Sequence, residues 1–326
     1  MQSRIVDHAI EQFDAAEQLG YDPGECAAAR WNCWMMLGDF GRAWEESDRI
    51  SRLDRDPNRF WTGESWKGKR VILRCLHGLG DTIQFIRYAP LLKSTCRSLI
   101  VQSHPQLVTL MECVPGVDGA ITWGEEQRSE WDLQMEVTEL PRAFRTTIAT
   151  IPRTVPYINV PQERFEWASG FFASRDSLRV GICWQSGDWD PSRSIPLEEF
   201  APLFTHDHCD FYALQKNADP AAITPYPALE ELESHASDVR DTAALIQNLD
   251  LVISVDTMTA HLAGALGKPV FVLLPGAADW RWMLERRDTP WYPTARLFRQ
   301  KEPARWENVA RAVLDAVASC SVHPGF

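Results

Sequence analysis

The chain has 326 residues, of which 45% are apolar and 14 are Trp, and its 33 Lys and Arg against 45 Asp and Glu give a formal net charge of −12. This length exceeds what one hydrophobic core usually serves, so we expect two domains and a smaller segment. The acidic balance and the lack of a compact Lys/Arg run argue against nucleic acid as a partner.

No membrane span is expected either. The most apolar stretch, residues 249–274, contains Asp250, Asp256, His261 and Lys268, so it lacks the roughly 20 uncharged residues that a spanning helix needs. The eight cysteines stand singly, without a C-x-x-C pair, and are interpreted as reduced packing residues. The N-terminus continues as an acidic amphipathic stretch without the features of an export signal. These patterns together predict a cytoplasmic protein.

Residues 1–62 are predicted to form a helical segment. Ile5, Ala9, Ile10 and Phe13 recur at helical spacing, and Gly20 supplies a stop. Two more helices are expected over 29–43 and 44–53, closed by Pro57. The small residues of this stretch resemble a tetratricopeptide repeat, in which Gly and Ala let antiparallel helices approach closely. A plain helical hairpin is the alternative that the sequence leaves open.

Residues 63–160 are predicted to form a first Rossmann-like domain. Short apolar runs alternate with helical stretches, which is typical of parallel-sheet units. Strands are expected near 71–76, 98–102, 120–122 and 131–135, with a helix near 81–93 after a glycine turn. Prolines at 141, 152, 156 and 161 then indicate an interdomain connection.

Residues 161–326 are predicted to form a second Rossmann-like domain. Strands are expected near 179–184, 210–214, 250–255 and 270–274, and helices near 197–204, 242–248, 257–266 and 305–318. Two such halves bind ligands in a crevice outside the carboxyl ends of their strands. The expected fold class is therefore α/β, with two Rossmann-like domains facing a cleft and an N-terminal helical segment.

The first motif with chemical potential is HGLGDT at 77–82, directly after the first expected strand. Glycines there let backbone N–H groups approach a ligand, and an acidic residue complements the start of a helix. The motif lacks the third glycine of a dinucleotide fingerprint and the G-K-[ST] of a P-loop. From spacing alone, Asp81 is either a helix cap or a catalytic base.

The second motif covers residues 250–275 as strand, turn, helix, turn and strand. A helix that opens near Thr257 offers unpaired N–H groups and a partial positive charge, which suit a diphosphate. In the alternative interpretation, Asp256 and Thr257 only cap that helix and His261 is a core histidine.

A third motif, WQSGD at 184–188, precedes Arg193, which either neutralises phosphate or is an exposed structural residue. A fourth, the aromatic and proline-rich stretch 279–300, is predicted to be a rigid irregular loop that stacks on a ligand or packs the terminal helix. No metal site is expected, because the pair His206 and His208 lacks further ligands and Asp188-x-Asp190 is interpreted as a chance match to a metal-binding D-x-D motif.

In their order along the chain, these segments resemble the heptosyltransferase-related, family nine-like glycosyltransferases of the kind fused to tetratricopeptide repeats. The resemblance covers about residues 65–315 and lies in HGLGDTIQFIRYAPLL, RSIPL, VDTMTAHLAGALGKPVFVLLP and DWRWMLERRDTPWYP. It implies a GT-B fold and an inverting, metal-independent transfer, without a cofactor, of a sugar from a nucleotide-diphosphate donor to a hydroxyl of a glycan or protein.

The resemblance also implies roles for particular residues. Asp81 matches the proposed base, and the acceptor side includes Gly78, Gly80 and Gln84. The donor side comprises Ser186, Gly187, Arg193, Gln215, Asp256, Thr257, Thr259, Ala260 and His261. The sequence of loop 186–189 departs from that of the family, so the identity of the donor is left open. The helical-repeat region is shorter than in the family, so whether the acceptor is a protein is also left open. A sugar-nucleotide epimerase and a non-catalytic binding scaffold are the alternative functions.

Overall fold

The computed structural model describes residues 2–51, 61–125, 131–172, 177–187 and 190–320. The chain divides into two compact units. Unit 1 comprises Met1–Glu112, Gly116–Arg153 and Ala278–Trp291, and unit 2 comprises Cys113–Pro115, Thr154–Ala277 and Tyr292–Phe326. The predicted helix end near Leu53, the closing Pro57 and the loop residues Asp188 and Trp189 lie outside the described residues.

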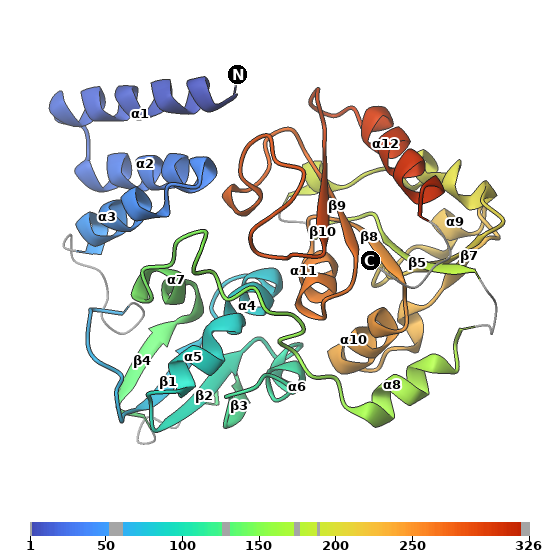
Figure 1. Cartoon of the computed structure of the whole chain (residues 1–326), viewed down its shortest axis with the longest axis horizontal. Coiled ribbons are helices and arrows are strands. Elements are labelled where there is room, and N and C mark those ends of the chain that lie inside the picture. Colours follow the sequence, from blue (N-terminus) through green and yellow to red (C-terminus); the bar gives the residue numbers. More distant parts are fainter. Residues whose placement is uncertain (1, 52–60, 126–130, 173–176, 188–189, 321–326) are drawn as a thin grey trace. The chain divides into compact units, whose positions relative to one another are not determined.

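Three helices open unit 1 and lie side by side (Figure 1): α1 (Gln2–Gln18), α2 (Pro23–Leu37) and α3 (Phe40–Ser51). The side chain of Asp22 accepts a hydrogen bond from the Glu25 N–H at 2.8 Å and thereby caps α2 six residues before its predicted start. Gly38 ends α2 with φ of 79°, the left-handed conformation that glycine adopts most readily. The predicted N-terminal helices are confirmed.

A buried arginine joins these helices. Arg30 of α2 is 2% exposed and lies 2.7 Å from both Glu17 of α1 and Glu46 of α3. Since an unpaired charge is costly to bury, this arrangement is stable only while both carboxylates stay in place. The helices also carry a small apolar cluster of Val6, Ile10 and Cys33, against which Leu284 of unit 1 packs.

The sheet of unit 1 is four-stranded and parallel, in the order β3-β2-β1-β4. Its strands are β1 (Arg70–Arg74), β2 (Ser98–Ser103), β3 (Gly119–Thr122) and β4 (Leu133–Glu136). Its helices are α4 (Leu79–Phe85), α5 (Ala89–Lys93), α6 (Val108–Met111) and α7 (Leu140–Ala143). The single helix predicted near 81–93 is interrupted by a 3-10 turn at Ile86–Tyr88, just before Pro90, which has no N–H to continue a helical ladder.

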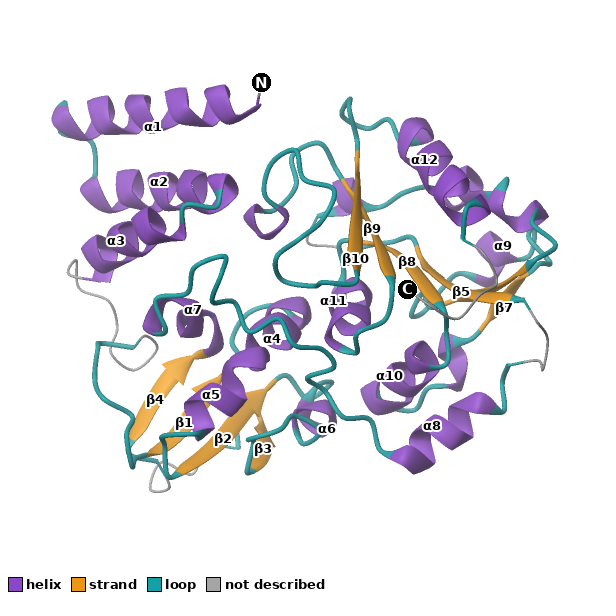
Figure 2. Ribbon diagram, in the orientation of Figure 1, coloured by secondary structure: helices purple, strands orange, loops and turns teal. Residues whose placement is uncertain are grey.

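The sheet of unit 2 is six-stranded and parallel, in the order β10-β9-β8-β5-β6-β7. Its strands are β5 (Leu178–Cys183), β6 (Cys209–Ala213), β7 (Leu229–Glu231), β8 (Leu251–Val255), β9 (Val270–Leu274) and β10 (Ala295–Arg299). Its helices are α8 (Gln162–Ser169), α9 (Pro220–Ile223), α10 (Val239–Gln247), α11 (Met258–Ala265) and α12 (Glu307–Ala318). Within unit 2, α12 lies on one side of the sheet, and α10 and α11 lie on the other (Figure 2).

Two predictions of local structure in the second half of the chain are wrong. The helix expected at 197–204 is replaced by short 3-10 turns at Leu197–Phe200 and Leu203–Thr205, since Pro202 removes a backbone donor from the middle of the stretch. The stretch 279–300, expected to be an irregular loop throughout, ends in the regular strand β10.

Within the part of the chain that the structure describes, no helix is both long and apolar enough to cross a membrane. In each unit all strands run in the same direction, so the loops that follow their carboxyl ends gather at one edge of the sheet. Both groups of predicted site residues lie in such loops or in the helices that follow them.

Candidate functional site

The amino end of α11 follows strand β8 directly. Thr257 is the N-cap residue, in an extended conformation, but its side chain makes no cap hydrogen bond. Its hydroxyl instead lies 3.1 Å from the Ser254 hydroxyl and 3.7 Å from the Cys183 thiol. The N–H groups of the first turn are therefore not capped by Thr257, which leaves the positive end of the helix dipole available to an anion.

Arg193 and His261 converge on the residue that precedes this cap. Arg193 donates from Nη1 to the Asp256 carbonyl oxygen at 3.0 Å, and its guanidinium lies 3.9 Å from the Asp256 carboxylate. His261 places Nε2 3.6 Å from the same carboxylate and Nδ1 2.8 Å from the Tyr292 hydroxyl. Arg193 is thus bound to the turn before α11, and His261 is fixed from two sides.

Gly264 explains why Tyr292 reaches His261. A Cβ atom at this position would lie 2.4 Å from Cδ1 of Tyr292, closer than any real contact. Only glycine lets the ring lie this close to α11. The packing of Gly264 on Tyr292 therefore determines the orientation of the His261 ring.

The loops after β5 and β6 are tied together by Gln215. Its side-chain oxygen accepts hydrogen bonds from the N–H of Gln185 at 2.8 Å and of Trp184 at 3.3 Å. Ser186 forms its hydrogen bond within its own loop, where its hydroxyl donates to the Asp190 carbonyl oxygen at 2.7 Å. Gly187 is exposed, with open space where a Cβ would stand.

The structure thus brings the predicted donor-side residues to loops and one helix start at a single edge of the unit 2 sheet. Thr259 and Ala260 are 6% and 0% exposed, so their side chains belong to the packed part of α11. Ala260 therefore exposes no atom to a ligand.

Sequence reasoning did not find Glu233, a buried carboxyl of unit 2. It follows β7 in the turn Glu233–His235 and is 8% exposed. Burial raises its pKa to about 7, although a hydrogen bond from the Thr242 hydroxyl at 2.8 Å and the charge of Lys216 act in the opposite direction. No sequence motif surrounds it, and only its burial makes it unusual.

On the acceptor side, Asp81 occupies the third position of α4. One of its carboxylate oxygens accepts a hydrogen bond at 3.0 Å from the N–H of Gly78, the N-cap residue, which is one of the two hydrogen bonds of a capping box. The other oxygen forms an ion pair with the Arg281 guanidinium. Gly80 lies within the first turn of the same helix. Asp81 is thus held at a defined position, with its side chain 24% exposed.

Arg281 is the principal residue that sequence reasoning missed in unit 1. Its guanidinium also binds Asp279 at 2.8 Å and lies over the rings of Trp280, at 4.6 Å, and Phe85, at 5.4 Å. Stacking of this kind holds a guanidinium in one orientation. The sequence showed an Arg and Trp cluster here, but nothing local connects it to a residue 200 positions earlier.

Glu136, at the end of β4, contacts the loop that follows β1. It is 1% exposed, accepts hydrogen bonds from the N–H of Thr138 at 2.6 Å and of Leu76 at 3.2 Å, and lies 3.9 Å from His77. Burial raises the pKa of this carboxyl against the effect of its hydrogen bonds. Gln84, which was assigned to the acceptor side, is fully buried in α4 and does not line the cavity described next.

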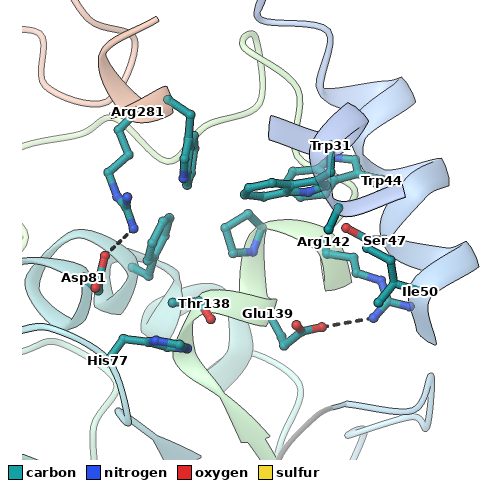
Figure 3. Close-up of a pocket in the computed structure, with 14 residues that line it drawn as sticks. Trp31, Trp44, Ser47, Ile50, His77, Asp81, Thr138, Glu139, Arg142 and Arg281 are labelled. Atoms are coloured by element: carbon teal, nitrogen blue, oxygen red, sulfur yellow. Dashed lines mark hydrogen bonds and ion pairs between the residues drawn. The ribbon is translucent and has the colours of Figure 1, made fainter. Parts of the chain in front are cut away.

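A cavity of about 350 Å³ lies beside Asp81, entirely within unit 1 (Figure 3). Its walls come from three parts of the chain: the N-terminal helices, the loops after β1 and β4, and the segment 278–291. They include Ala28, Trp31, Trp44, Ser47, His77, Asp81, Thr138, Glu139, Arg142, Trp280 and Arg281. The volume is in the range of small-molecule sites, which is roughly 300–1,000 Å³.

Among the described residues, no group of three or more His, Cys, Asp or Glu is placed to hold a metal ion. The predicted independence of metal stays a prediction.

Comparison with known proteins gives the site a context. Residues 237–309, which include β8, α11 and β9, match the model of glycosyltransferase family 9 (heptosyltransferase). Over 358 aligned residues the chain is 25% identical to Protein FlbA of Caulobacter vibrioides, an alignment that covers 96% of this chain and 59% of that protein. The chain therefore spans about three-fifths of the length of this curated relative.

Solved structures show the same fold. A family 9 glycosyl transferase from Veillonella parvula DSM 2008 has a TM-score of 0.60 at 13% identity, covering 78% of this chain and 98% of that one. E. coli ADP-heptose LPS heptosyltransferase II has a TM-score of 0.56 at 12% identity, covering 77% and 98%. The predicted GT-B type of fold is thereby confirmed, and residues 237–309 match the glycosyltransferase family 9 model.

Two further similar structures contain a nucleotide sugar or iron. E. coli heptosyltransferase WaaC with ADP-2-deoxy-2-fluoro heptose has a TM-score of 0.50 at 13% identity, covering 76% of this chain and 99% of that one. The glycosyltransferase TibC from enterotoxigenic E. coli, described as iron-containing and dodecameric, has a TM-score of 0.50 at 14% identity, covering 77% and 70%.

Proposed function

We propose that the chain is a glycosyltransferase that moves a sugar from a nucleoside-diphosphate donor, bound by unit 2, to an acceptor hydroxyl, bound by unit 1. The observation that carries this proposal is the cluster at the amino end of α11. There an uncapped helix start, the Arg193 guanidinium and His261 meet at Asp256, within the segment that matches the glycosyltransferase model. Such an arrangement stabilises a diphosphate without requiring a metal.

An ADP-linked heptose is the donor that the comparisons favour. WaaC, of the same fold, was solved with an ADP-heptose analogue, and heptosyltransferase II is named for ADP-heptose. We therefore propose an ADP-sugar as the donor of this chain, without a metal.

The proposed reaction is an inverting displacement. The acceptor oxygen forms a bond to the anomeric carbon of the donor while the bond from that carbon to the diphosphate oxygen breaks. The acceptor proton passes to the Asp81 carboxylate, and the nucleoside diphosphate leaves with the electron pair of the broken bond. Each oriented donor or cation at the diphosphate contributes on the order of 3 kcal/mol to the transition state, so α11 and Arg193 suffice for a large acceleration.

We further propose that α2 and α3 form one tetratricopeptide-like unit. The support is a pair of packed helices joined through Gly38 in a left-handed conformation.

The substitution Asp81→Asn tests the function directly. We expect it to abolish sugar transfer from ADP-heptose and to leave the affinity for ADP unchanged, because Asp81 belongs to unit 1 and the donor residues to unit 2. Transfer is measured as ADP release in the presence of acceptor, and affinity by titration calorimetry.

Asp132→Asn is the matched control. Asp132 is also an aspartate of unit 1 that pairs with an arginine, Arg70, at 2.9 Å, but it does not line the cavity. Full turnover by the Asp81→Asn enzyme would refute the assigned base. Failure of the wild-type chain to bind ADP, UDP or GDP would refute the transferase itself.

A further inference from the structure

We propose that His77, which lines the cavity beside Asp81, takes up the proton that Asp81 has removed from the acceptor and releases it to solvent. This inference rests on the proposed glycosyl transfer and adds a second proton carrier to it. The proton leaves the Asp81 carboxyl group for a nitrogen of the imidazole ring and then passes to water. This transfer restores the Asp81 carboxylate for the next cycle.

The loop that carries His77 is held from both sides by carboxylates. Glu136, at the end of β4, accepts a hydrogen bond from the N–H of Leu76, the residue before His77, at 3.2 Å. Asp81 accepts one from the N–H of Gly78, the residue after His77, at 3.0 Å. Because the two bonded N–H groups belong to the chain neighbours of His77, both carboxylates lie close to this residue.

The imidazole ring lies between a buried carboxylate and solvent. Its Nε2 is 3.9 Å from the carboxylate of Glu136, whose side chain is 1% exposed, whereas the His77 side chain is 53% exposed. The ring lines the same cavity as Asp81 (Figure 3). At this distance the contact with Glu136 is an ion pair and not a hydrogen bond. The exposed ring can therefore turn towards Asp81 and towards solvent while the Glu136 charge stays near it.

Glu136 favours a positive charge on this ring. Burial raises the pKa of the Glu136 carboxyl, although it accepts hydrogen bonds from the N–H groups of Leu76 and Thr138 and from the Thr138 hydroxyl. A neighbouring positive charge offsets the cost of a buried carboxylate. The imidazolium that forms when His77 takes up a proton is therefore stabilised, as in the histidine–carboxylate pairs of other enzymes.

The direct partners of Asp81 cannot take its proton. One of its oxygens faces the Gly78 N–H and the other faces the Arg281 guanidinium. Both partners only donate hydrogen bonds, so a proton that arrives on the carboxylate needs a different acceptor.

Of the charged groups that line the cavity, Glu139 and Arg142 are paired with each other at 3.0 Å. Histidine is the side chain that both gains and loses a proton near neutral pH. His77 is the one histidine among the described residues of the cavity wall, which makes it the group suited to carry the proton away.

Three variants test the inference, with ADP-heptose as donor and water as acceptor, so that no other acceptor has to be identified. His77→Gln removes the proton-accepting nitrogen from an exposed side chain, and Glu136→Gln removes a charge but keeps an oxygen that accepts hydrogen bonds. His104→Gln is the matched control. His104 also follows a strand of unit 1, but its Nδ1 accepts a hydrogen bond from the Gln106 N–H at 3.2 Å, and it does not line the cavity.

ADP release by the full-length proteins is measured from about pH 5 to 9, with and without added imidazole, alongside ADP titration and thermal unfolding. We expect His77→Gln to lower kcat at pH 7 about tenfold or more and to leave KM for ADP-heptose and the affinity for ADP unchanged, since His77 belongs to unit 1. Added imidazole should restore most of the rate, because it carries the proton in place of the side chain.

The pH profile and the other variants give further readouts. The fall of kcat on the acid side, where His77 is already protonated, should be absent from His77→Gln. Glu136→Gln should lower kcat by no more than about fivefold, because an ion pair with an exposed partner contributes little. His104→Gln should behave as the wild type does, with no gain from imidazole.

Several outcomes would overturn the inference while the transferase proposal survives. One is an unchanged kcat in His77→Gln. Another is a lowered kcat that imidazole does not restore and that keeps the acid-side fall, because His77 would then act only through the shape of its loop. A wild type that binds ADP but releases none from ADP-heptose would also overturn it, since no proton is then taken from water in the cavity. Absence of ADP binding in the wild type would instead contradict the proposed function.

Discussion

Replacing Gly264 by Ala perturbs the donor side through one close contact. The added Cβ would stand 2.4, 2.6 and 2.9 Å from three ring carbons of Tyr292, whereas ordinary contacts begin at 3.4 Å. The difference of 3.4 − 2.4 Å requires the ring to move by about 1 Å. Since the Tyr292 hydroxyl lies 2.8 Å from Nδ1 of His261, such a displacement takes it beyond hydrogen-bonding distance.

Two energies set the size of the effect. Overpacking a buried site costs about 1–3 kcal/mol, and replacing glycine by alanine in a helix returns up to about 1 kcal/mol. We expect a net loss of roughly 1–2 kcal/mol in the free energy of unfolding, or a fall in Tm of roughly 2–8 °C for a domain of this size. Loss of the hydrogen bond to His261, worth about 1 kcal/mol, should weaken ADP binding about fivefold.

Thermal unfolding measures the loss of stability, and ADP titration separately measures the loss of affinity. Tyr292→Phe removes only the hydroxyl, so it should reproduce the fivefold loss of affinity with a smaller change in Tm. Gly264→Ala combined with Tyr292→Phe should weaken ADP binding no further than either change alone, because both act through one hydrogen bond. Gly41→Ala in α3, whose Cβ would make only an ordinary contact at 3.6 Å, is the control and should not lower Tm.

A wild-type melting temperature for Gly264→Ala would show that the close contact with the Tyr292 ring is absent. Wild-type ADP affinity in Tyr292→Phe would show that His261 needs no support from Tyr292.

Two further predictions concern charged groups. Arg281→Gln should lower kcat by roughly tenfold or more without changing ADP affinity, because the Asp81 carboxylate loses its charged partner. Arg281→Lys should recover part of the activity. An unchanged kcat in Arg281→Gln would show that the pair has no catalytic role. Burial raises the pKa of Glu233 from 4.5 to about 7, so the folded state favours the protonated carboxyl. The contribution of this carboxyl to the free energy of unfolding is full below about pH 4.5 and is lost as the pH rises through 7. Glu233→Gln should remove this loss, on the order of 3 kcal/mol by pH 8, and flatten the dependence of Tm on pH between 5 and 8; an unchanged slope in calorimetry would contradict it.

The sequence predicted the elements whose signals are local. The runs around β1 and β8 are short and apolar and end at turn residues, so strand, turn and following helix were recognised without tertiary information. Strand β10 was not, because Arg296 and Arg299 alternate with apolar residues beside a proline-rich stretch that resembles an irregular loop. The three-residue β7 is too short to have any periodicity.

The candidate site likewise contains residues that a local motif predicted and residues that only the tertiary structure brings together. Residues from Asp256 to His261 follow one another in the turn after β8 and in α11, so one motif predicted them as a group. The contact between Asp81 and Arg281 and the contribution of Trp31 to the cavity depend on chain segments that only the folded unit brings together. No single window of the sequence contains such a site, and pairing information from tertiary structure is needed to find it.

The N-terminal helices are built into unit 1 and cannot be removed without disturbing it. Trp44 of α3 donates from its indole nitrogen to the Thr146 carbonyl at 2.7 Å, and Asp48 of α3 pairs with Arg142 at 3.0 Å and with Arg145 at 2.7 Å. Deleting the helices would leave Arg142 with only Glu139 as a partner among these residues and would uncover the apolar surface beneath them. Lost activity in a truncated chain would therefore report damage to unit 1 as much as a missing wall of the cavity. Substitutions on the cavity-facing side of α2 separate the two effects, because they change the wall and leave these anchoring contacts in place.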